Sequence, residues 1–515
     1  MLRQRKINHW SFTVFWLAVS LAYVLGFVLA DFAGTPWSSS GGLAVIAAQV
    51  FVVAVFSAAV IGLMAVWRPV FAVTFPLLVT LSAVAAWFRL TMNISLTPNI
   101  VQVVVVNDLN TWGTVITADL IVWTLAALAF GVLAAVCRYR QVRQPGRPWV
   151  WTAAFAVVAA VPVSVARLEG PVLSRMPYSM YSATRGYLRN RTEIAENRNN
   201  FENTPAVSGA DSLDVVVVIG ESLRADRLGL NGYGRQTTPG LSADTAVVSL
   251  PRMFSPLTFT YVSVPRIVTR ADADHPDRAY SEQSFITLFR RAGFSTAWLS
   301  NQDDATGYVY FMHEADTLRQ VNAGRSLYDY ADWYDTDLLP PLDSVLAAGK
   351  PRSLTVLHTI GQHWWTPSHT PDSLVRWKPV ADSRVIAELS PAMLSNSYDN
   401  SVLATDDFLC RVIHRLRNRR AVVIFISDHG EALGEDGIFL HAGDPAPGTA
   451  AYNAVHNTAC LVWYSVKYAQ SYPRKIRALR AGSARNFTTD NIFHSVLDAA
   501  DIATPALDLK LSFMR

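Results

Sequence analysis

The chain has 515 residues, of which 51% are hydrophobic and only 16% are charged, and its formal net charge is +4. Because an ordinary soluble domain carries about 25% charged residues, part of this protein must face lipid. The small net charge and the absence of a basic stripe interleaved with aromatic residues exclude a nucleic-acid-binding protein. At this length we expect two structural units.

Five apolar segments in the first third of the sequence are long enough to cross a hydrocarbon core of about 30 Å as helices. They predict a five-helix transmembrane domain over residues 1–167. A cleaved signal peptide over residues 1–30 is the competing interpretation of the first segment. The segments are Phe12 to Ala30, Leu43 to Trp67, Val70 to Phe88, Ile116 to Cys137 and Val150 to Val165.

Basic residues predict the orientation of these helices, because lysine and arginine are retained in the cytoplasm during membrane insertion. Arg3, Arg5 and Lys6 precede the first segment, and four arginines lie within residues 138–147, between the fourth and fifth segments. Residues 31–42 and 91–115, the loops of opposite parity, carry neither lysine nor arginine. We therefore expect a cytoplasmic N-terminus in the bacterial inner membrane, and a periplasmic location for everything after Arg167.

Residues 168–210, rich in Arg, Asn and Ser, are expected to form a linker on the periplasmic membrane surface, and residues 211–515 a soluble domain. In the soluble domain short apolar runs alternate with helical stretches such as Phe285 to Ala292. This alternation predicts an α/β domain with a mostly parallel sheet sandwiched by helices. The expected strands are Asp214 to Gly220, Ser295 to Ser300, Ser353 to Thr359, Ala421 to Ser427 and Ala459 to Tyr464.

Candidate metal ligands follow three of these strands. Glu221 comes directly after the first strand, His358 and His363 lie at and beyond the end of the third, and Asp428 and His429 follow the fourth. A lone aspartate or histidine after a strand is more often a helix cap or a turn residue. Here carboxylate and imidazole side chains follow three separate strands, at the edge where α/β sheets bind ligands. This combination predicts a zinc or manganese site.

A metal site of this kind needs a hydroxyl nucleophile, since metal coordination lowers the pKa of a hydroxyl. The segment from Met253 to Arg270 supplies four candidate hydroxyl residues in an otherwise apolar loop, and Ser222 is a fifth candidate. The residue types alone do not choose among them. The four in the loop are Ser255, Thr258, Thr260 and Ser263.

Six motifs in chain order resemble the phosphoethanolamine transferases of the alkaline phosphatase and sulfatase superfamily. The resemblance covers most of the chain, including the membrane part, and implies an alkaline phosphatase-like soluble fold. The motifs are VVVVIGESLRADRLGLNGYGRQTTPGL from Val215, the loop at Thr258, FRRAGFSTAWLSNQ from Phe289, LHTIGQH from Leu357, YDNSVLATDDFL from Tyr398 and ISDHGEALGE from Ile426.

The resemblance implies roles for particular residues. Glu221, Thr258, Asp428 and His429 would bind the catalytic zinc, and Thr258 would carry the covalent phosphoethanolamine. The choice of Thr258 rests on its position before the tripeptide Ser263 to Pro265.

Further matched positions are expected to contact substrate or a second metal. His363 and His441 match two histidines that contact the phosphate or a second zinc. Asn301 matches a substrate contact, with a loop-capping role as the alternative. Asn110 stands in the loop where the family often has a glutamate that binds the headgroup. Ser222 would then cap a helix behind Glu221.

The implied reaction moves phosphoethanolamine from phosphatidylethanolamine to lipopolysaccharide lipid A, a core sugar or a glucan, and releases diacylglycerol. The chain would act as a monomer among membrane lipids. A glycerolphosphate transferase, a sulfatase-like hydrolase and an inactive envelope scaffold are the alternatives, although a sulfatase maturation motif of the CxPxR type is absent from the sequence. The chain has only three cysteines, unlike the disulfide-rich lipid A enzymes, and the sequence leaves open whether Cys410 and Cys460 pair.

Overall fold

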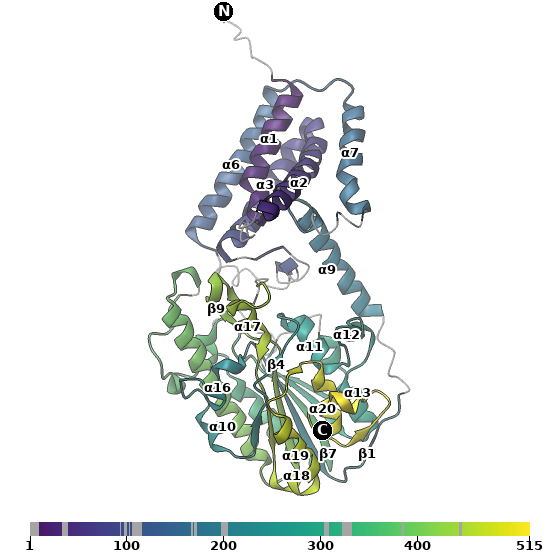
Figure 1. Ribbon diagram of the computed structural model, residues 1–515, viewed down its shortest axis with the longest axis vertical. Coiled ribbons are helices and arrows are strands. Elements are labelled where there is room, and N and C mark those ends of the chain that lie inside the picture. Colours follow the sequence, from purple (N-terminus) through teal and green to yellow (C-terminus); the bar gives the residue numbers. More distant parts are fainter. Residues whose placement is uncertain are drawn as a thin grey trace, which may run out of the picture. The chain divides into compact units, whose positions relative to one another are not determined.

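The computed structural model describes residues 10–32, 40–92, 94–96, 100–101, 104–105, 116–165, 168, 172–196, 204–302, 308–321, 332–383, 386–441 and 445–515. The chain divides into two compact units, one of residues 1–107 with 115–189 and one of residues 108–114 with 190–515. Figure 1 shows the helical first unit in purple and blue and the mixed second unit in teal to yellow. Asn110 lies outside the described residues, so its predicted role stays a prediction.

The first unit is a helical bundle whose apolar side chains face outward as well as inward, as lipid-exposed helices do. Four of the described helical spans are long and apolar enough to cross a membrane, and α7 is a shorter apolar helix. Four of the five predicted crossings therefore correspond to helices that are long enough to span a membrane, and the fifth crossing stays a prediction. The elements are α1 (Phe12–Gly26), η1 (Val28–Phe32), α2 (Ser40–Val66), α3 (Arg68–Met92), α6 (Ala118–Arg140) and α7 (Pro148–Ser164).

Arg138, one of the arginines from which the orientation is predicted, also caps the C-terminal end of α2. Its guanidinium is buried and donates hydrogen bonds to the carbonyls of Ala65 at 2.7 Å and Val66 at 3.0 Å. These carbonyls belong to the last turn of the helix, where no intrahelical donor reaches them. A cation at a helix C-terminus also interacts favourably with the helix dipole.

Residues 168–210 contain a helix, α9 (Tyr178–Glu196), where the sequence predicted only a linker. The boundary between the two compact units falls inside this helix, at residues 189 and 190. A polar composition was a poor guide here, because Arg, Asn and Glu are compatible with an exposed helix.

The second unit is built on a seven-stranded sheet with the strand order β3-β12-β8-β2-β7-β5-β6. The strands from β8 to β6 run parallel to one another, and β12 runs antiparallel to both of its neighbours. All five predicted strands are present, within one residue at each end. The strands are β2 (Leu213–Gly220), β3 (Val247–Ser249), β5 (Ser295–Ser300), β6 (Thr317–Gln320), β7 (Arg352–His358), β8 (Ala421–Ser427) and β12 (Cys460–Tyr464).

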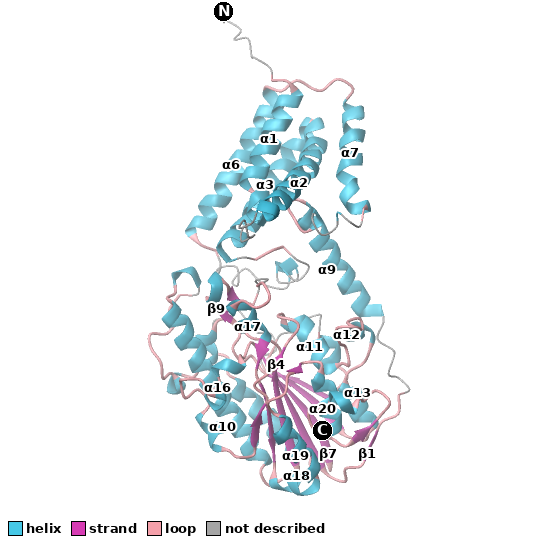
Figure 2. Cartoon of the chain, in the orientation of Figure 1, coloured by secondary structure: helices cyan, strands magenta, loops and turns pink. Residues whose placement is uncertain are grey.

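Helices cover both faces of this sheet, as the cartoon in Figure 2 shows. In β2 the side chains of Val215, Val217 and Ile219 belong to one buried cluster, and those of Val216 and Val218 belong to another. This follows from the alternation of side chains along a strand. Helices on the first face are α11 (Thr260–Val268), α13 (Phe285–Arg291), α19 (Pro473–Gly482) and α20 (Asn491–Ala499); on the second they are α10 (Pro239–Ala243), α15 (Leu339–Ala347) and α16 (Pro391–Leu416).

A small second sheet lies next to the segment that leads into α11. It has the strand order β11-β4-β13, with β11 antiparallel and β13 parallel to β4. Helix α17 (Ala450–His456) runs directly into β11. The strands are β4 (Met253–Phe254), β11 (Asn457–Thr458) and β13 (Phe487–Thr488).

Candidate metal centre

The register of the central strands brings two carboxylates together. In the parallel pair of β2 and β8, Gly220 stands opposite Ser427. The next residue of each strand is Glu221 and Asp428, so both carboxylates leave the sheet at neighbouring points of its carboxyl edge. In α/β sheets this edge is where ligands bind.

Glu221, Asp428 and His429 form a compact cluster of donor atoms. One ligand atom from each lies within 4.8 Å of the others, and all three residues are at most 1% exposed. The Nε2 atom of His429 is 3.3 Å from Asp428 Oδ2 and 3.5 Å from Glu221 Oε1. Two ligand atoms bound tetrahedrally to one zinc ion are about 3.4 Å apart, given metal–ligand bonds of about 2.1 Å.

The histidine has its lone pair on the side that faces the carboxylates. His429 Nδ1 lies 2.8 Å from the carbonyl oxygen of Gly430, which can only accept, so Nδ1 carries the proton and Nε2 is free to bind a metal. Burial, together with the neighbouring His441, lowers the pKa of His429 to about 3. The ring is therefore neutral at physiological pH.

The two carboxyl groups respond differently to their surroundings. Burial raises the pKa of Glu221, but His429, His363 and the Ser222 hydroxyl outweigh it and hold that pKa at about 2. Burial and the adjacent Glu221 carboxylate raise the pKa of Asp428 well above its usual range. Asp428 Oδ2 is buried and has no hydrogen-bond partner among the described residues. A buried carboxylate oxygen without a partner fits a cation ligand, and the mixed oxygen and nitrogen donor set fits zinc.

The hydroxyl that reaches this cluster is that of Thr260. Its Oγ1 donates to Glu221 Oε2 at 2.8 Å and lies 3.4 Å from His429 Nε2. Thr258, the predicted ligand, makes no hydrogen bond with the described residues and lies two positions earlier in an irregular segment. Thr260 is the first residue of α11, and that helix start directs its side chain to the metal cluster.

Two further predicted histidines border the cluster. The ring centroids of His441 and His429 are 4.4 Å apart, and His441 Nδ1 lies 3.3 Å from both carboxylate oxygens of Glu431. Burial lowers the pKa of His441, but Glu431 more than offsets it, so the net shift is upward. His363 is close enough to lower the pKa of Glu221, and its buried Nδ1 has no partner among the described residues.

Gly361 allows the segment that carries His363 to pass close to Glu221. It has a φ of +49°, and a Cβ at this position would lie 2.7 Å from the Glu221 carbonyl oxygen. Only glycine tolerates both conditions.

Asn301 and Ser222 have structural contacts. Asn301 is 1% exposed, donates to Asp335 at 2.9 Å and accepts from Trp333 Nε1 at 2.5 Å. These contacts match the loop-capping alternative and leave its predicted substrate contact untested. Ser222 caps no helix, contrary to our expectation, because its φ of 58° turns the chain away from a helical start. Its hydroxyl instead donates to Glu221 Oε1 at 2.8 Å.

Two residues of the site were not singled out by their sequence position. Gln302 Nε2 donates to Glu221 Oε2 at 3.1 Å, and Ser255 Oγ lies 2.6 Å from the backbone oxygen of Asp428. Gln302 follows β5, so the strand-end rule that found Glu221 and Asp428 would also have found it. Ser255 was one of five candidate hydroxyls, and nothing in the sequence indicated that it would hydrogen-bond to the backbone of Asp428.

The known proteins to which this chain is similar are phosphoethanolamine transferases. Phosphoethanolamine transferase EptA of Salmonella typhimurium is 29% identical over 297 residues, which are 56% of this chain and 53% of that protein. The chain thus matches about half the length of this relative. The soluble domain of lipooligosaccharide phosphoethanolamine transferase A from Neisseria meningitidis is 30% identical, with a TM-score of 0.55 over 60% of this chain and 95% of that domain.

Solved structures extend the likeness to the whole fold. The full-length integral membrane protein from Neisseria meningitidis has a TM-score of 0.79 over 99% of both chains at 24% identity. The periplasmic domain of EptC from Escherichia coli, solved in complex with zinc, has a TM-score of 0.52 at 25% identity over 61% of this chain and 89% of that domain.

The sulfatase family model matches residues 214–502, more than half of the chain. These residues include the whole metal cluster and Thr260. The chain therefore belongs to the sulfatase family, and its relatives within that family are phosphoethanolamine transferases.

Proposed function

We propose that this protein is a metal-dependent phosphoethanolamine transferase of the bacterial cell envelope, with Thr260 as its nucleophile. The observation that carries this proposal is the position of the Thr260 hydroxyl, 2.8 Å from Glu221 Oε2 at the edge of a buried cluster of metal-type ligands. The names of the relatives supply the group that is transferred. Thr260 takes the role that the sequence pattern gave to Thr258.

Glu221, Asp428 and His429 would hold one zinc ion, and the Thr260 oxygen would be a further ligand. When bound, zinc lowers the pKa of a coordinated hydroxyl and neutralises charge on phosphoryl oxygens. The likeness to a zinc-bound periplasmic domain supports this choice of metal. A second zinc at His363 and His441 stays a prediction.

The reaction proceeds in two displacements at phosphorus. Thr260 Oγ1 attacks the phosphorus of the phosphatidylethanolamine headgroup, the bond to the glycerol oxygen breaks, and that oxygen takes up the proton that Thr260 loses as diacylglycerol leaves. The oxygen of an acceptor hydroxyl or phosphate then attacks the threonine-bound phosphorus and restores the Thr260 hydroxyl. His363 and His441, which border the cluster, would donate hydrogen bonds to the phosphoryl oxygens.

We place the second unit in the periplasm and the helical unit in the inner membrane. Four apolar helical spans support the membrane location, and the arginines of residues 138–147 support the orientation. The acceptor class is lipopolysaccharide or lipooligosaccharide, as the name of one relative suggests. The donor is phosphatidylethanolamine, because that lipid presents the headgroup in the membrane that holds the enzyme.

A pair of matched substitutions tests the nucleophile. Thr260→Val preserves side-chain shape and removes only the hydroxyl, so we expect it to lower headgroup transfer by a factor on the order of 10³ or more. Thr258→Val, two residues away, is the control and is expected to keep transfer within a few-fold of the parent. Transfer is measured with labelled phosphatidylethanolamine and purified lipopolysaccharide. Full transfer by Thr260→Val, or its loss only in Thr258→Val, contradicts the proposal.

A further inference from the structure

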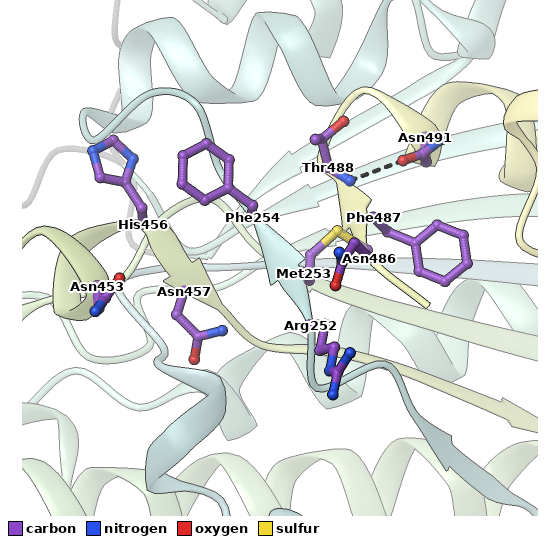
Figure 3. Close-up of a pocket in the computed structure, with 10 residues that line it drawn as sticks. All are labelled: Arg252, Met253, Phe254, Asn453, His456, Asn457, Asn486, Phe487, Thr488 and Asn491. Carbon is purple, nitrogen blue, oxygen red and sulfur yellow. Dashed lines mark hydrogen bonds between the residues drawn. The ribbon is translucent and has the colours of Figure 1, made fainter. Parts of the chain in front are cut away.

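A second concave site lies beside the small sheet, apart from the metal ligands. It has a volume of about 480 Å³ and is lined by strands β4, β11 and β13, the end of α17 and the start of α20. Figure 3 shows the side chains of the residues that line it. The volume falls within the range of about 300–1,000 Å³ that small-molecule sites occupy.

Several polar groups in this pocket are unused by the protein itself. The side chains of Arg252, Asn453 and Asn486 are exposed and make no hydrogen bond or ion pair within the described part of the chain. Asn491 is different, because its amide accepts from the backbone of Thr488 and donates to that of Leu511, both at 2.8 Å. Asn491 therefore shapes the wall, and the other three can bind a ligand.

The pocket has a positive character. None of the residues that line it is acidic, and Arg252 contributes a guanidinium. A second guanidinium, that of Arg485, lies 5.3 Å above the ring of Phe487, which lines the pocket. Arginine pairs with carboxylate and phosphate groups through two parallel hydrogen bonds, so the charge favours an anionic ligand.

Aromatic rings also line the pocket and form a platform. The rings of Phe254 and His456 are stacked at 13° with centroids 5.0 Å apart, and the ring centroid of Tyr452 lies 4.2 Å from that of His456. A flat apolar face beside amide donors and acceptors is suited to a molecule with an apolar face and a hydroxyl-bearing rim. Sugars have this form.

Ser255 connects this platform to the candidate metal centre through hydrogen bonds. His456 Nδ1 lies 2.6 Å from the Ser255 backbone oxygen, and the Ser255 hydroxyl lies 2.6 Å from the Asp428 backbone oxygen. Along the chain, Phe254 is six residues from Thr260, which limits their Cα separation to about 20 Å. A ligand in the pocket is thus held on the same framework as the nucleophile.

We propose that this pocket binds an anionic saccharide portion of the acceptor, through Arg252, Asn453 and Asn486 and the Phe254–His456 platform. The ligand class is a sugar that carries phosphate or carboxylate groups. This inference rests on the proposed function, because it gives the pocket to the molecule that receives phosphoethanolamine from Thr260.

A binding measurement tests the pocket without any transfer reaction. Glucose 1-phosphate is titrated into the full-length protein in detergent, with glucose and inorganic phosphate as separate comparison ligands. We expect glucose 1-phosphate to bind more tightly than either, and Arg252→Ala combined with Asn486→Ala to raise its Kd roughly tenfold, about 1.4 kcal/mol. Arg477→Ala, an exposed arginine of α19 outside the pocket, is the matched control. Equal affinities of the parent and the double variant, or equal binding of inorganic phosphate, overturn the proposal.

Transfer kinetics then separate this proposal from the proposed function. With lipopolysaccharide as acceptor, the double variant is expected to raise the acceptor KM about tenfold and to keep its kcat at saturating acceptor. Diacylglycerol release without acceptor reports the first step alone. If the parent protein releases no diacylglycerol, the transferase function is contradicted. The pocket is tested independently by the binding titration. An acceptor KM unchanged in the double variant contradicts the pocket assignment.

Discussion

His358 is a buried histidine whose substitution should make the protein less sensitive to acid. It stands at the end of β7, is fully buried, and neither ring nitrogen has a hydrogen-bond partner among the described residues. The rings of Trp298 and Tyr308 contact it edge-on, with centroids 5.6 Å and 4.9 Å away. Protonation would therefore place an unpaired charge inside the protein.

The sign and size of the effect follow from the pKa. Burial lowers the pKa of His358 to about 4 from the ordinary histidine value of 6.5, although the Glu221 carboxylate opposes the shift. Since the folded pKa lies below the unfolded one, the stabilisation is complete above pH 6.5 and is lost as the pH falls toward 4. At pH 4 the loss amounts to about 3 kcal/mol, at about 1.36 kcal/mol for each pKa unit.

His358→Phe keeps an aromatic ring and removes the titrating group. The apparent unfolding temperature of the full-length protein is measured at pH 7 and pH 4, with a chelator present so that metal release makes no contribution. At roughly 2 °C for each kcal/mol in a large domain, we expect the variant to lose ~6 °C less than the parent between the two pH values. Phe311→Leu, in another fully buried ring, controls for general destabilisation and should leave the pH dependence unchanged. If the unfolding temperature of His358→Phe falls between pH 7 and pH 4 by as much as that of the parent, the reasoning is refuted.

Three other predictions concern the metal, helix α11 and Cys460. Removing zinc with a chelator should abolish transfer and lower the unfolding temperature, and added zinc at ~1,000 times its Kd should restore about 4 kcal/mol of stability; transfer that survives complete metal removal would exclude the metal role. Arg266→Leu should destabilise the fold by about 2 kcal/mol or more, because Arg266 holds α11 to Asp490 through hydrogen bonds of 2.6 and 3.0 Å. Arg266→Lys should recover only part of the loss, since lysine cannot form the paired contact. Cys460, free and buried in the sheet, with a pKa raised by burial, should resist a thiol reagent until the protein unfolds.

The clustering of Glu221, Asp428 and His429 could be predicted from the sequence because sheet geometry is regular. Glu221 and Asp428 each follow an apolar run directly, and in a parallel pair such residues emerge side by side whenever the strands are neighbours in register. The alternation of apolar runs and helices had already indicated a covered sheet. Burial of both strands on both faces made their hydrophobic runs continuous and easy to recognise.

The hydroxyl that contacts this cluster could not be chosen in the same way. Thr258 and Thr260 differ by two positions in one apolar segment, and in an extended segment such residues point to the same side. The start of α11 separates them, because Thr260 is its first residue and Thr258 precedes it. A helix boundary is uncertain by one or two residues even when coordinates are available. A choice between threonines two residues apart therefore needs the tertiary structure.

Backbone conformation around Glu221 shows how the site is held in place. Ser222 has a φ of 58°, a left-handed conformation that costs a non-glycine residue about 1–2 kcal/mol. The same turn lets the Ser222 amide donate to Asp428 Oδ1 at 3.0 Å and its carbonyl accept from the Tyr398 hydroxyl at 2.6 Å. Its side-chain hydroxyl meanwhile reaches Glu221. One strained residue thus contacts the carboxylates of both Glu221 and Asp428. These contacts offset the strain and fix the two carboxylates relative to each other. Strained backbone of this kind is typical of functional sites.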